Sequence, residues 1–231
     1  MKHVLVTGAT SGIGKDILES LKESKQYEPI GLGRKIESLD GFKTIKADLS
    51  TPAASSQISE GLRDHLGGDS LYAIIHCAGV FLRKPFLETT DEDWDQQFQT
   101  NVMGTIRATR VALGHMQEGA RIITVGSTLG LRPVAQTAAY SASKAAIDNL
   151  TRCLALELAD QKITVNCIHP GIVETPIHGG SHTFADDMAA AQPLGRVGQP
   201  SDIFSSIEYF LAPGSAWTTG SVLNVDGGIN L

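Results

Sequence analysis

Short apolar runs alternate with helical segments along the whole chain of 231 residues, and this alternation restricts the fold more than any other feature. Apolar runs separated by helices are typical of a parallel sheet that is covered by helices on both faces. We expect seven strands, at residues 4–7, 29–32, 44–47, 73–77, 121–125, 164–169 and 222–225. The pattern therefore predicts an α/β fold, in which residues 1–231 form a single domain around a doubly wound, seven-stranded parallel sheet.

The helices between these strands have recognisable starts, with one exception. We expect helices to begin near Ile13, Pro52, Asp91, Thr137 and Ser201. Thr90 or Asp91, Thr137 and Ser201 supply the side-chain oxygens that are preferred at helix N-termini. Only residues 33–43 separate the second and third strands, which is too short for a crossover with a full helix. We expect a single short turn there, at residues 36–39.

Charge and cysteine content restrict the partners of the protein and the cellular compartment in which it is expected. The 19 basic and 25 acidic residues give a net charge of −6, and no run of basic residues exceeds two, so a nucleic-acid partner is not expected. Cys77, Cys153 and Cys167 form no C-x-x-C pair and lie in apolar segments, which predicts buried free thiols in a reducing compartment. The apolar run that begins at Met1 is too short for a signal peptide or a membrane helix. These features predict a cytoplasmic protein without a membrane partner.

A glycine-rich segment, Thr7-Gly8-Ala9-Thr10-Ser11-Gly12-Ile13-Gly14, joins the first strand to the first helix. Glycine at such a turn lets the chain bend sharply, lets a pyrophosphate approach backbone N–H groups and lets the helix pack on the strand. Glycine-rich turns alone are common, but the strand–turn–helix context predicts a dinucleotide site. The residues expected to contact this cofactor are Gly8, Thr10, Ser11, Gly12, Ile13 and Gly14.

Arg34 indicates which dinucleotide binds, because the residue about 20 positions after the glycine loop faces the ribose. An acidic residue at that position accepts a hydrogen bond from the 2′-hydroxyl of NAD. This chain has no acidic residue there and reads Gly33-Arg34-Lys35. A guanidinium can grip a 2′-phosphate with two hydrogen bonds, so the sequence favours NADP(H) over NAD(H). The alternative is that Arg34 is a solvated surface charge.

Asp48 stands at the end of the third strand, where it can meet the edge of an adenine, with Leu49 beside it. The alternative is that Asp48 caps the following helix. That alternative is less favoured, because Ser50 or Thr51 suits the capping role.

A tyrosine and a lysine, Tyr140 and Lys144, lie four residues apart in the helix expected from Thr137, which places them on one face. Tyrosine ionises at about pH 10, and a neighbouring ammonium favours the phenolate. Ser127 follows the strand at 121–125, at the carboxyl end of the sheet, where open α/β sheets bind ligands. Asn101 lies within a helical segment although asparagine has low helix propensity, and the alternative is an exposed helical side chain. Together these residues suggest acid–base chemistry at the sheet edge.

With these residues in order, the chain resembles the short-chain dehydrogenase/reductase family along nearly its full length. The matching features are Thr7-Gly8-x-x-x-Gly12-Ile13-Gly14, Asp48, Ala78-Gly79, Asn101, Ser127, Tyr140-x-x-x-Lys144, Pro170-Gly171, Pro193-Leu194-Gly195-Arg196 and Asn224-Val225-Asp226-Gly227-Gly228. Residues 194–202 and the final stretch are most similar to 3-oxoacyl-(acyl carrier protein) reductases. The resemblance implies a Rossmann-type domain and an NAD(P)-dependent oxidoreductase acting on CH–OH groups.

The resemblance also implies a role for each matching residue. Tyr140 would be the general acid that protonates a substrate carbonyl oxygen as NADPH gives hydride to its carbon, and Lys144 would favour its phenolate form and hold the nicotinamide ribose hydroxyls. Ser127 would hydrogen-bond the carbonyl oxygen, and Asn101 would anchor a water that feeds protons through Lys144. The residues that would line the remaining cofactor are Cys77, Ala78, Gly79, Pro170, Gly171, the backbone of Val173 and the hydroxyl of Thr175, the last two at the carboxamide.

Two departures from the family pattern stand out. Where the family usually reads Asn-Asn-Ala-Gly, this chain has His76-Cys77-Ala78-Gly79, and a thiol cannot replace the hydrogen bonds of an amide. A His-x-Ala-Gly variant resembles ketoreductase domains, so loss of activity does not follow. The second departure is the short crossover after Arg34, which would leave the adenosine end of the cofactor more exposed than usual.

The segment at about 175–192 is expected to be a substrate lid, with Gly179 and Gly180 as hinges. His178 and His182 lack a third ligand, so no metal site is expected. The function that follows is NADP-dependent reduction of a ketone or 3-oxoacyl thioester to a secondary alcohol. The alternatives are NAD-dependent oxidation of a secondary or sugar alcohol, and a non-catalytic NADP sensor.

Assembly follows from the family resemblance. The helices at 91–116 and 137–158 are those with which such reductases pair, and the second carries Ala145, Ala146, Leu150, Leu154 and Leu158. This apolar surface exceeds what one sheet face requires. A homotetramer is expected first, and a dimer next.

Overall fold

The strands form one parallel sheet in the order β3-β2-β1-β4-β5-β6-β7. The computed structural model describes residues 1–178, 189, 190 and 192–231. The strands are β1 (Lys2–Thr7), β2 (Tyr27–Gly33), β3 (Lys43–Lys46), β4 (Leu71–His76), β5 (Met116–Val125), β6 (Thr164–Pro170) and β7 (Val222–Val225). All seven predicted strands are confirmed, and the strand order reverses between β1 and β4. A crevice above the carboxyl ends of strands at such a reversal is the general ligand site of open α/β sheets.

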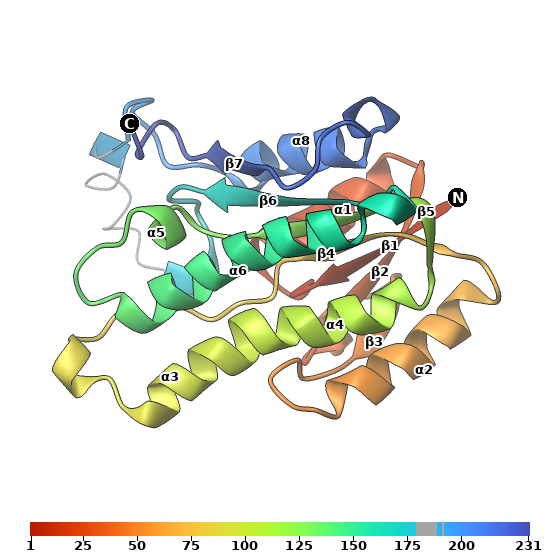
Figure 1. Ribbon diagram of the computed structural model, residues 1–231, viewed down its shortest axis with the longest axis horizontal. Coiled ribbons are helices and arrows are strands. Elements are labelled where there is room, and N and C mark those ends of the chain that lie inside the picture. Colours follow the sequence, from red (N-terminus) through yellow and green to blue (C-terminus); the bar gives the residue numbers. More distant parts are fainter. Residues whose placement is uncertain (179–188, 191) are drawn as a thin grey trace.

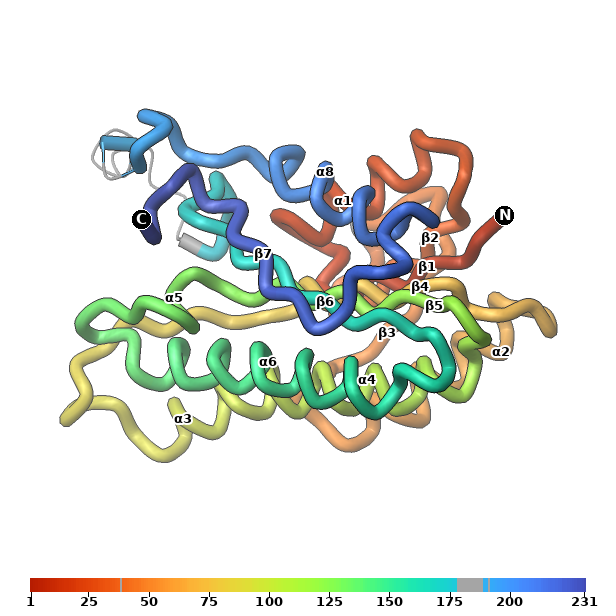
Figure 2. The backbone as a smooth tube through the Cα atoms, turned by 45° about the horizontal axis from the view of Figure 1, so that its top comes forward, coloured from red at the N-terminus to blue at the C-terminus, as the bar shows by residue number. Residues whose placement is uncertain are grey.

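Helices cover both faces of this sheet (Figure 1). They are α1 (Gly12–Glu23), α2 (Ala54–Leu66), α3 (Asp91–Phe98), α4 (Gly104–Leu113), α5 (Thr128–Leu131), α6 (Ala138–Glu157) and α8 (Pro200–Leu211). The helices α1 and α8 pack together on one face, whereas α2, α4 and α6 lie on the other (Figure 2). In α1 the buried positions are Gly14, Ile17, Leu18 and Leu21, the spacing of a single helix face.

The core is divided into two clusters by the sheet. One cluster includes Leu5, Ile58 and Ala108 and lies under α2 and α4, and the other includes Val6, Ile17 and Ile203 and lies under α1 and α8. Adjacent strand residues such as Leu5 and Val6 point to opposite faces, so each strand contributes to both clusters. Leu158, which the sequence placed on an outer surface, is 7% exposed and belongs to the first cluster.

The predicted helix starts are correct to within two residues, but one predicted cap, Ser201, is wrong, and another, Thr137, occupies the N-cap position without making a capping hydrogen bond. Thr90 forms a capping box with Asp93, as expected for a helix beginning at Asp91. Thr137 precedes α6, but its hydroxyl donates to the carbonyl of Val134 instead of accepting from the helix. Ser201 is not the cap of α8. The N-cap residue is Gln199, which precedes Pro200, and its backbone N–H donates to the Asp202 carboxylate in a capping box.

The short crossover between β2 and β3 carries a 3-10 turn at Ile36–Ser38, as predicted, with Leu39 buried behind it.

The prediction of three buried cysteines is wrong for Cys153, which is exposed on the outer face of α6, whereas Cys167 is buried and Cys77 half-buried. Among the described residues, no helix has the length and apolar character needed to cross a bilayer.

Candidate active site

A cavity of about 950 Å³ opens above the carboxyl ends of the strands and collects most of the predicted site residues. Every residue predicted to contact the cofactor lines it: Gly8, Thr10, Ser11, Gly12, Ile13, Gly14, Arg34, Asp48, Leu49, Cys77, Ala78, Gly79, Tyr140, Lys144, Pro170, Gly171, Val173 and Thr175. Ser127 lines it as well, whereas Asn101 lies just behind the wall. Parallel strands bring these distant segments to one edge of the sheet, the edge at which α5 and the C-terminus also lie (Figure 1).

The glycine loop forms a cradle that only glycine can build. Gly8 has a φ of +66°, and a Cβ there would lie 2.6 Å from the backbone nitrogen of Ala78. A Cβ at Gly14 would collide with the carbonyl oxygen of Gly8, because helix α1 packs directly on the loop. Gly12, with a φ of +54°, would place a Cβ 3.3 Å from Thr175 on the opposite wall. The loop therefore fits a pyrophosphate laid against backbone at the start of α1.

The far end of the cavity carries Arg34 and Asp48. Arg34 is exposed and lines the cavity just beyond β2. One Asp48 carboxylate oxygen accepts hydrogen bonds from the backbone and hydroxyl of Ser50, at 3.0 and 2.7 Å. These bonds from Ser50, and more weakly the charge of Arg34, hold the pKa of Asp48 below its usual value. Helix α2 begins at Ala54 after Ala53, so neither Asp48 nor Ser50 nor Thr51 caps it, and the predicted Ser50 or Thr51 cap is wrong.

Tyr140 and Lys144 lie on the buried face of α6, each 7% exposed, and both line the cavity. The lysine nitrogen is 5.8 Å from the centre of the tyrosine ring and donates to the carbonyl of Val125 at 2.9 Å. That bond uses one of its three protons, which leaves two for other acceptors. The ring of Phe81 packs edge-on against Tyr140 at 4.9 Å and fixes its orientation. No described residue hydrogen-bonds the Tyr140 hydroxyl, so it is available to a ligand.

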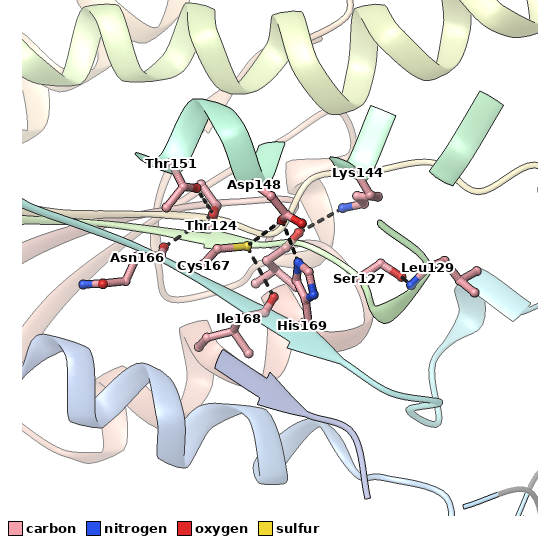
Figure 3. A network of polar contacts seen from close by, with 11 residues as sticks. Thr124, Ser127, Leu129, Lys144, Asp148, Thr151, Asn166, Cys167, Ile168 and His169 are labelled. Atoms are coloured by element: carbon pink, nitrogen blue, oxygen red, sulfur yellow. Dashed lines mark hydrogen bonds and ion pairs between the residues drawn. The ribbon is translucent and has the colours of Figure 1, made fainter. Parts of the chain in front are cut away.

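Ser127 directly follows the turn after β5 and occupies the N-cap of the short helix α5. Its hydroxyl oxygen accepts a hydrogen bond from the backbone N–H of Leu129 at 3.2 Å (Figure 3). Ser127 is 9% exposed. The hydrogen bond fixes the oxygen but leaves the hydroxyl proton unused. Ser127 can therefore donate to an oxygen in the cavity.

Asn101 is 2% exposed and lies in a π-helical turn, Gln99–Met103, that joins α3 to α4. Its side-chain amide pairs with both backbone groups of Val80, at 2.8 and 3.0 Å, and donates to the Ser143 hydroxyl at 2.9 Å. The alternative reading of an exposed helical asparagine is therefore wrong. The amide joins the segment after β4 to the helix of Tyr140. A Cβ at Gly79 would lie 3.3 Å from the Asn101 side-chain oxygen and 3.6 Å from the Lys144 nitrogen. Asn101 and Lys144 therefore both lie next to Gly79 in the cavity wall.

At the departure from the family pattern, His76-Cys77, the backbone is held by Thr7. The hydroxyl oxygen of Thr7 accepts both the Cys77 and the Ala78 backbone N–H, each at 3.2 Å, which braces the edge of β4 against β1. Burial raises the pKa of the Cys77 thiol to about 12 and lowers the pKa of His76 to about 3, so both are neutral at physiological pH. The His76 ring hydrogen-bonds Thr109 at 2.9 Å. Neither side chain supplies a charged or nucleophilic group to the cavity.

A buried polar network behind Lys144 was not predicted from the sequence. His169, fully buried at the end of β6, donates to Asp148 on α6 at 2.6 Å, and the Cys167 thiol also points to that carboxylate at 3.7 Å (Figure 3). Burial raises the pKa of the Cys167 thiol to about 12, so the sulfur stays protonated. The three ligand atoms lie within 4.8 Å of one another, but the direct hydrogen bond between His169 and Asp148 leaves no gap for a cation. The network joins the Tyr140 helix to the strand that leads into Pro170.

Other cavity residues were also missed, because they carry no motif. Apolar residues from the segments that follow the strands also line the cavity: Val80, Phe81, Leu129, Val134, Ile172, Ile177 and Ile229. Arg83 is the single charged residue among these additions. The one sequence signal for Val80, Phe81 and Arg83 is their position directly after a strand, since ligands bind at the carboxyl ends of strands. Most of the predicted lid at 175–192, including Gly179, Gly180 and His182, lies outside the described residues, as does the His178 side chain.

The doubly wound sheet, the cavity at its strand reversal and the glycine cradle together define a dinucleotide-binding fold. Residues 8–230 match the family described as enoyl-(acyl carrier protein) reductase. Versicolorin reductase from Emericella nidulans is 31% identical over 98% of this chain and 95% of that protein. A 3-oxoacyl-(acyl carrier protein) reductase from Vibrio cholerae is 30% identical over 99% and 97%.

Solved structures agree with these sequence relatives. A short chain dehydrogenase from Burkholderia cenocepacia, in complex with NADP, has a TM-score of 0.90 and 30% identity, covering 100% of this chain and 98% of that chain. The chain belongs to the short-chain dehydrogenase/reductase family and is an oxidoreductase of that family.

Proposed function

We propose that the protein reduces a ketone or a 3-oxoacyl thioester to a secondary alcohol with NADPH. The observation that carries this proposal is Tyr140, which lines the cavity beside Lys144 and whose hydroxyl has no hydrogen-bond partner among the described residues. Ser127 lines the same cavity, and its hydroxyl proton is not used by the bond that its oxygen accepts from Leu129. Two free O–H donors in one apolar-walled cavity suit a carbonyl oxygen that becomes a hydroxyl.

Each polar residue of the cavity has its own role in the proposed proton transfer. Ser127 donates a hydrogen bond to the substrate oxygen and polarises the carbonyl, and Tyr140 transfers its proton to that oxygen as negative charge develops. When bound, NADPH supplies the hydride that the carbonyl carbon accepts. Lys144, anchored on Val125, would hold the ribose hydroxyls of the cofactor with its remaining protons, and its positive charge would stabilise the phenolate that Tyr140 leaves behind. Asn101 holds the adjoining wall, because its side-chain amide hydrogen-bonds both backbone groups of Val80.

The glycine cradle, Cys77 to Gly79 and Pro170 to Thr175 would hold the cofactor along the cavity. Thr175 donates to the Val173 carbonyl at 3.4 Å, a long bond that the hydroxyl can exchange for the nicotinamide carboxamide. The site thus contains side chains suited to each end of a dinucleotide: Arg34 and Asp48 at the adenosine and Thr175 at the nicotinamide.

Arg34 supports a preference for NADP(H), and the NADP complex of the Burkholderia cenocepacia relative is in line with it. Replacing Arg34 by alanine removes the group expected to grip the 2′-phosphate. We expect the Kd for NADPH to rise at least about tenfold, because charge-assisted hydrogen bonds are lost, while the Kd for NADH changes little. Calorimetric titration of both cofactors measures this difference.

Lys46→Ala is the matched control, because Lys46 is an exposed cation on the neighbouring strand that pairs with Glu37 outside the cavity. The control should leave both affinities unchanged. Equal binding of NADH and NADPH to the wild type, or an unchanged NADPH affinity in Arg34→Ala, would remove the cofactor assignment.

NADPH oxidation with a panel of ketones, 3-oxoacyl thioesters and quinones tests the proposed reaction. We expect turnover of at least one carbonyl class with NADPH. Tight NADPH binding without turnover of any carbonyl would contradict the proposal and favour the non-catalytic sensor. Faster oxidation of alcohols with NAD would favour the dehydrogenase alternative.

We propose a homotetramer as the working assembly, with a dimer next. On the outer face of α6, Ala145, Ala146 and Leu150 are only half-buried and Leu156 is 81% exposed, which is more apolar surface than the sheet requires. Light scattering should give four times the chain mass of 24.5 kDa, and a monomer would contradict the assembly.

The free cysteines support a reducing, cytoplasmic location.

A further inference from the structure

We propose that Arg83 is a substrate-binding residue that recognises a carboxylate or phosphate group on the carbonyl compound. This inference rests on the proposed carbonyl reduction and names the class of substrate. Arg83 lies in the loop after β4, is exposed, and lines the cavity that holds Tyr140. It carries none of the sequence motifs.

The position of Arg83 is set by two contacts between its loop and the segment that carries Tyr140. On one side, the Phe81 ring packs against the Tyr140 ring at 4.9 Å. On the other side, the Lys84 backbone N–H donates to the Gln136 carbonyl at 2.7 Å, four residues before the tyrosine. Arg83 lies between these contacts, so it belongs to the Tyr140 end of the cavity and not to the end formed by Arg34.

The charged side chains of the cavity wall differ in what they already bind. They are Arg34, Asp48, Arg83 and Lys144. Lys144 donates to Val125, and Asp48 accepts from Ser50 and lies near the charge of Arg34. No described residue forms a hydrogen bond or ion pair with Arg83. The neighbouring Lys84, in contrast, is paired with Asp93 at 2.6 Å.

A guanidinium that has no partner among the described residues and lies on a partly apolar wall favours an anionic ligand with an apolar body. Phe81, Val134 and Ile177 offer apolar contacts in the same cavity, while the Arg83 fork can hold an oxyanion with two parallel hydrogen bonds. The whole chain carries a charge of −6, which repels anions at long range, so attraction of an anionic substrate depends on local cations such as Arg83 and Lys144 at the cavity wall. The structure thus fits a substrate with an apolar body, a ketone at Tyr140 and an oxyanion at some distance from it.

The test compares matched acids and esters. A series of linear oxo acids, with increasing separation between ketone and carboxylate, is assayed beside the corresponding methyl esters, which lack the charge. A 3-oxoacyl coenzyme A thioester and its neutral N-acetylcysteamine analogue form a second pair, which tests phosphate as the source of the oxyanion. We expect kcat/KM to favour the charged member at least about tenfold at one separation or in the thioester pair.

In Arg83→Gln this charged-to-neutral ratio should fall to within about twofold of unity, because the amide keeps the polarity but not the charge. Arg63→Gln, an exposed arginine on α2 that does not line this cavity, should retain the wild-type ratio. A wild-type ratio near unity in every pair, or an unchanged ratio in Arg83→Gln, overturns the inference while the carbonyl reduction stands.

A protein that reduced none of these compounds would contradict the proposed function, and the subsite is then measured by binding. Calorimetry with NADP-loaded protein compares each acid with its ester. Tighter binding of an acid that is lost in Arg83→Gln supports the subsite, and equal binding of acid and ester overturns it.

Discussion

Replacing Tyr140 by phenylalanine should lower kcat by at least about 10²–10⁴-fold, the range attributed to a positioned general acid. The substitution removes only the hydroxyl of this cavity-lining residue and keeps the ring that packs against Phe81 at 4.9 Å. The Kd for NADPH should therefore change little. NADPH oxidation under saturating substrate, together with fluorescence titration of NADPH, separates the loss of chemistry from a loss of binding.

Tyr209→Phe is the control for this experiment, because Tyr209 is a half-exposed tyrosine on α8 whose hydroxyl hydrogen-bonds Thr218 at 3.1 Å, away from the cavity. It should retain the wild-type kcat. If Tyr140→Phe kept kcat within about tenfold of the wild type, well short of the loss expected for a general acid, another group would have to protonate the substrate.

Replacing Asp148 by alanine should lower the free energy of unfolding by about 3 kcal/mol. His169 is fully buried and its other ring nitrogen has no partner among the described residues, so the change would leave the imidazole without any hydrogen bond. The Cys167 thiol loses the same acceptor. Urea unfolding followed by circular dichroism measures the change.

Asp148→Asn is the matched control, because the amide oxygen can still accept the His169 N–H. We expect it to lose about 1 kcal/mol, as for one weakened hydrogen bond. Equal stability of Asp148→Ala and the wild type would show that the network does not hold α6 to β6. A kcat decrease in Asp148→Ala at temperatures where it is folded would follow from displacement of Tyr140 and Lys144, which share α6 with Asp148.

The strands and the cofactor side of the cavity were predictable because they depend on local pattern. The strand at 222–225 has the predicted bounds, and the short turn after Arg34 follows from chain length between β2 and β3. Gly8 and Gly14 were recognisable because a close backbone approach excludes every other residue there. Tyr140 and Lys144 were recognisable because helical spacing fixes their common face.

What could not be predicted depends on contacts between segments far apart in the chain. Asp148 and His169 are 21 residues apart and meet only because α6 packs on β6. The π-helical turn at Asn101 arises where its amide binds Val80, 21 residues earlier. Arg83 belongs to a loop whose position depends on contacts with Gln136 and Tyr140, so its sequence neighbours give no sign of a cavity.

The central claim is that this cavity transfers hydride to a carbonyl carbon while Tyr140 protonates the oxygen. The most direct measurement is the fate of deuterium when NADPH labelled at the transferable position is incubated with protein and the best carbonyl of the panel. We expect one deuterium on the carbinol carbon of the product, found by mass spectrometry and NMR, and at least about 100-fold less labelled product with Tyr140→Phe over the same time. Product without deuterium at that carbon, or labelled product formed equally fast by Tyr140→Phe, would contradict the account.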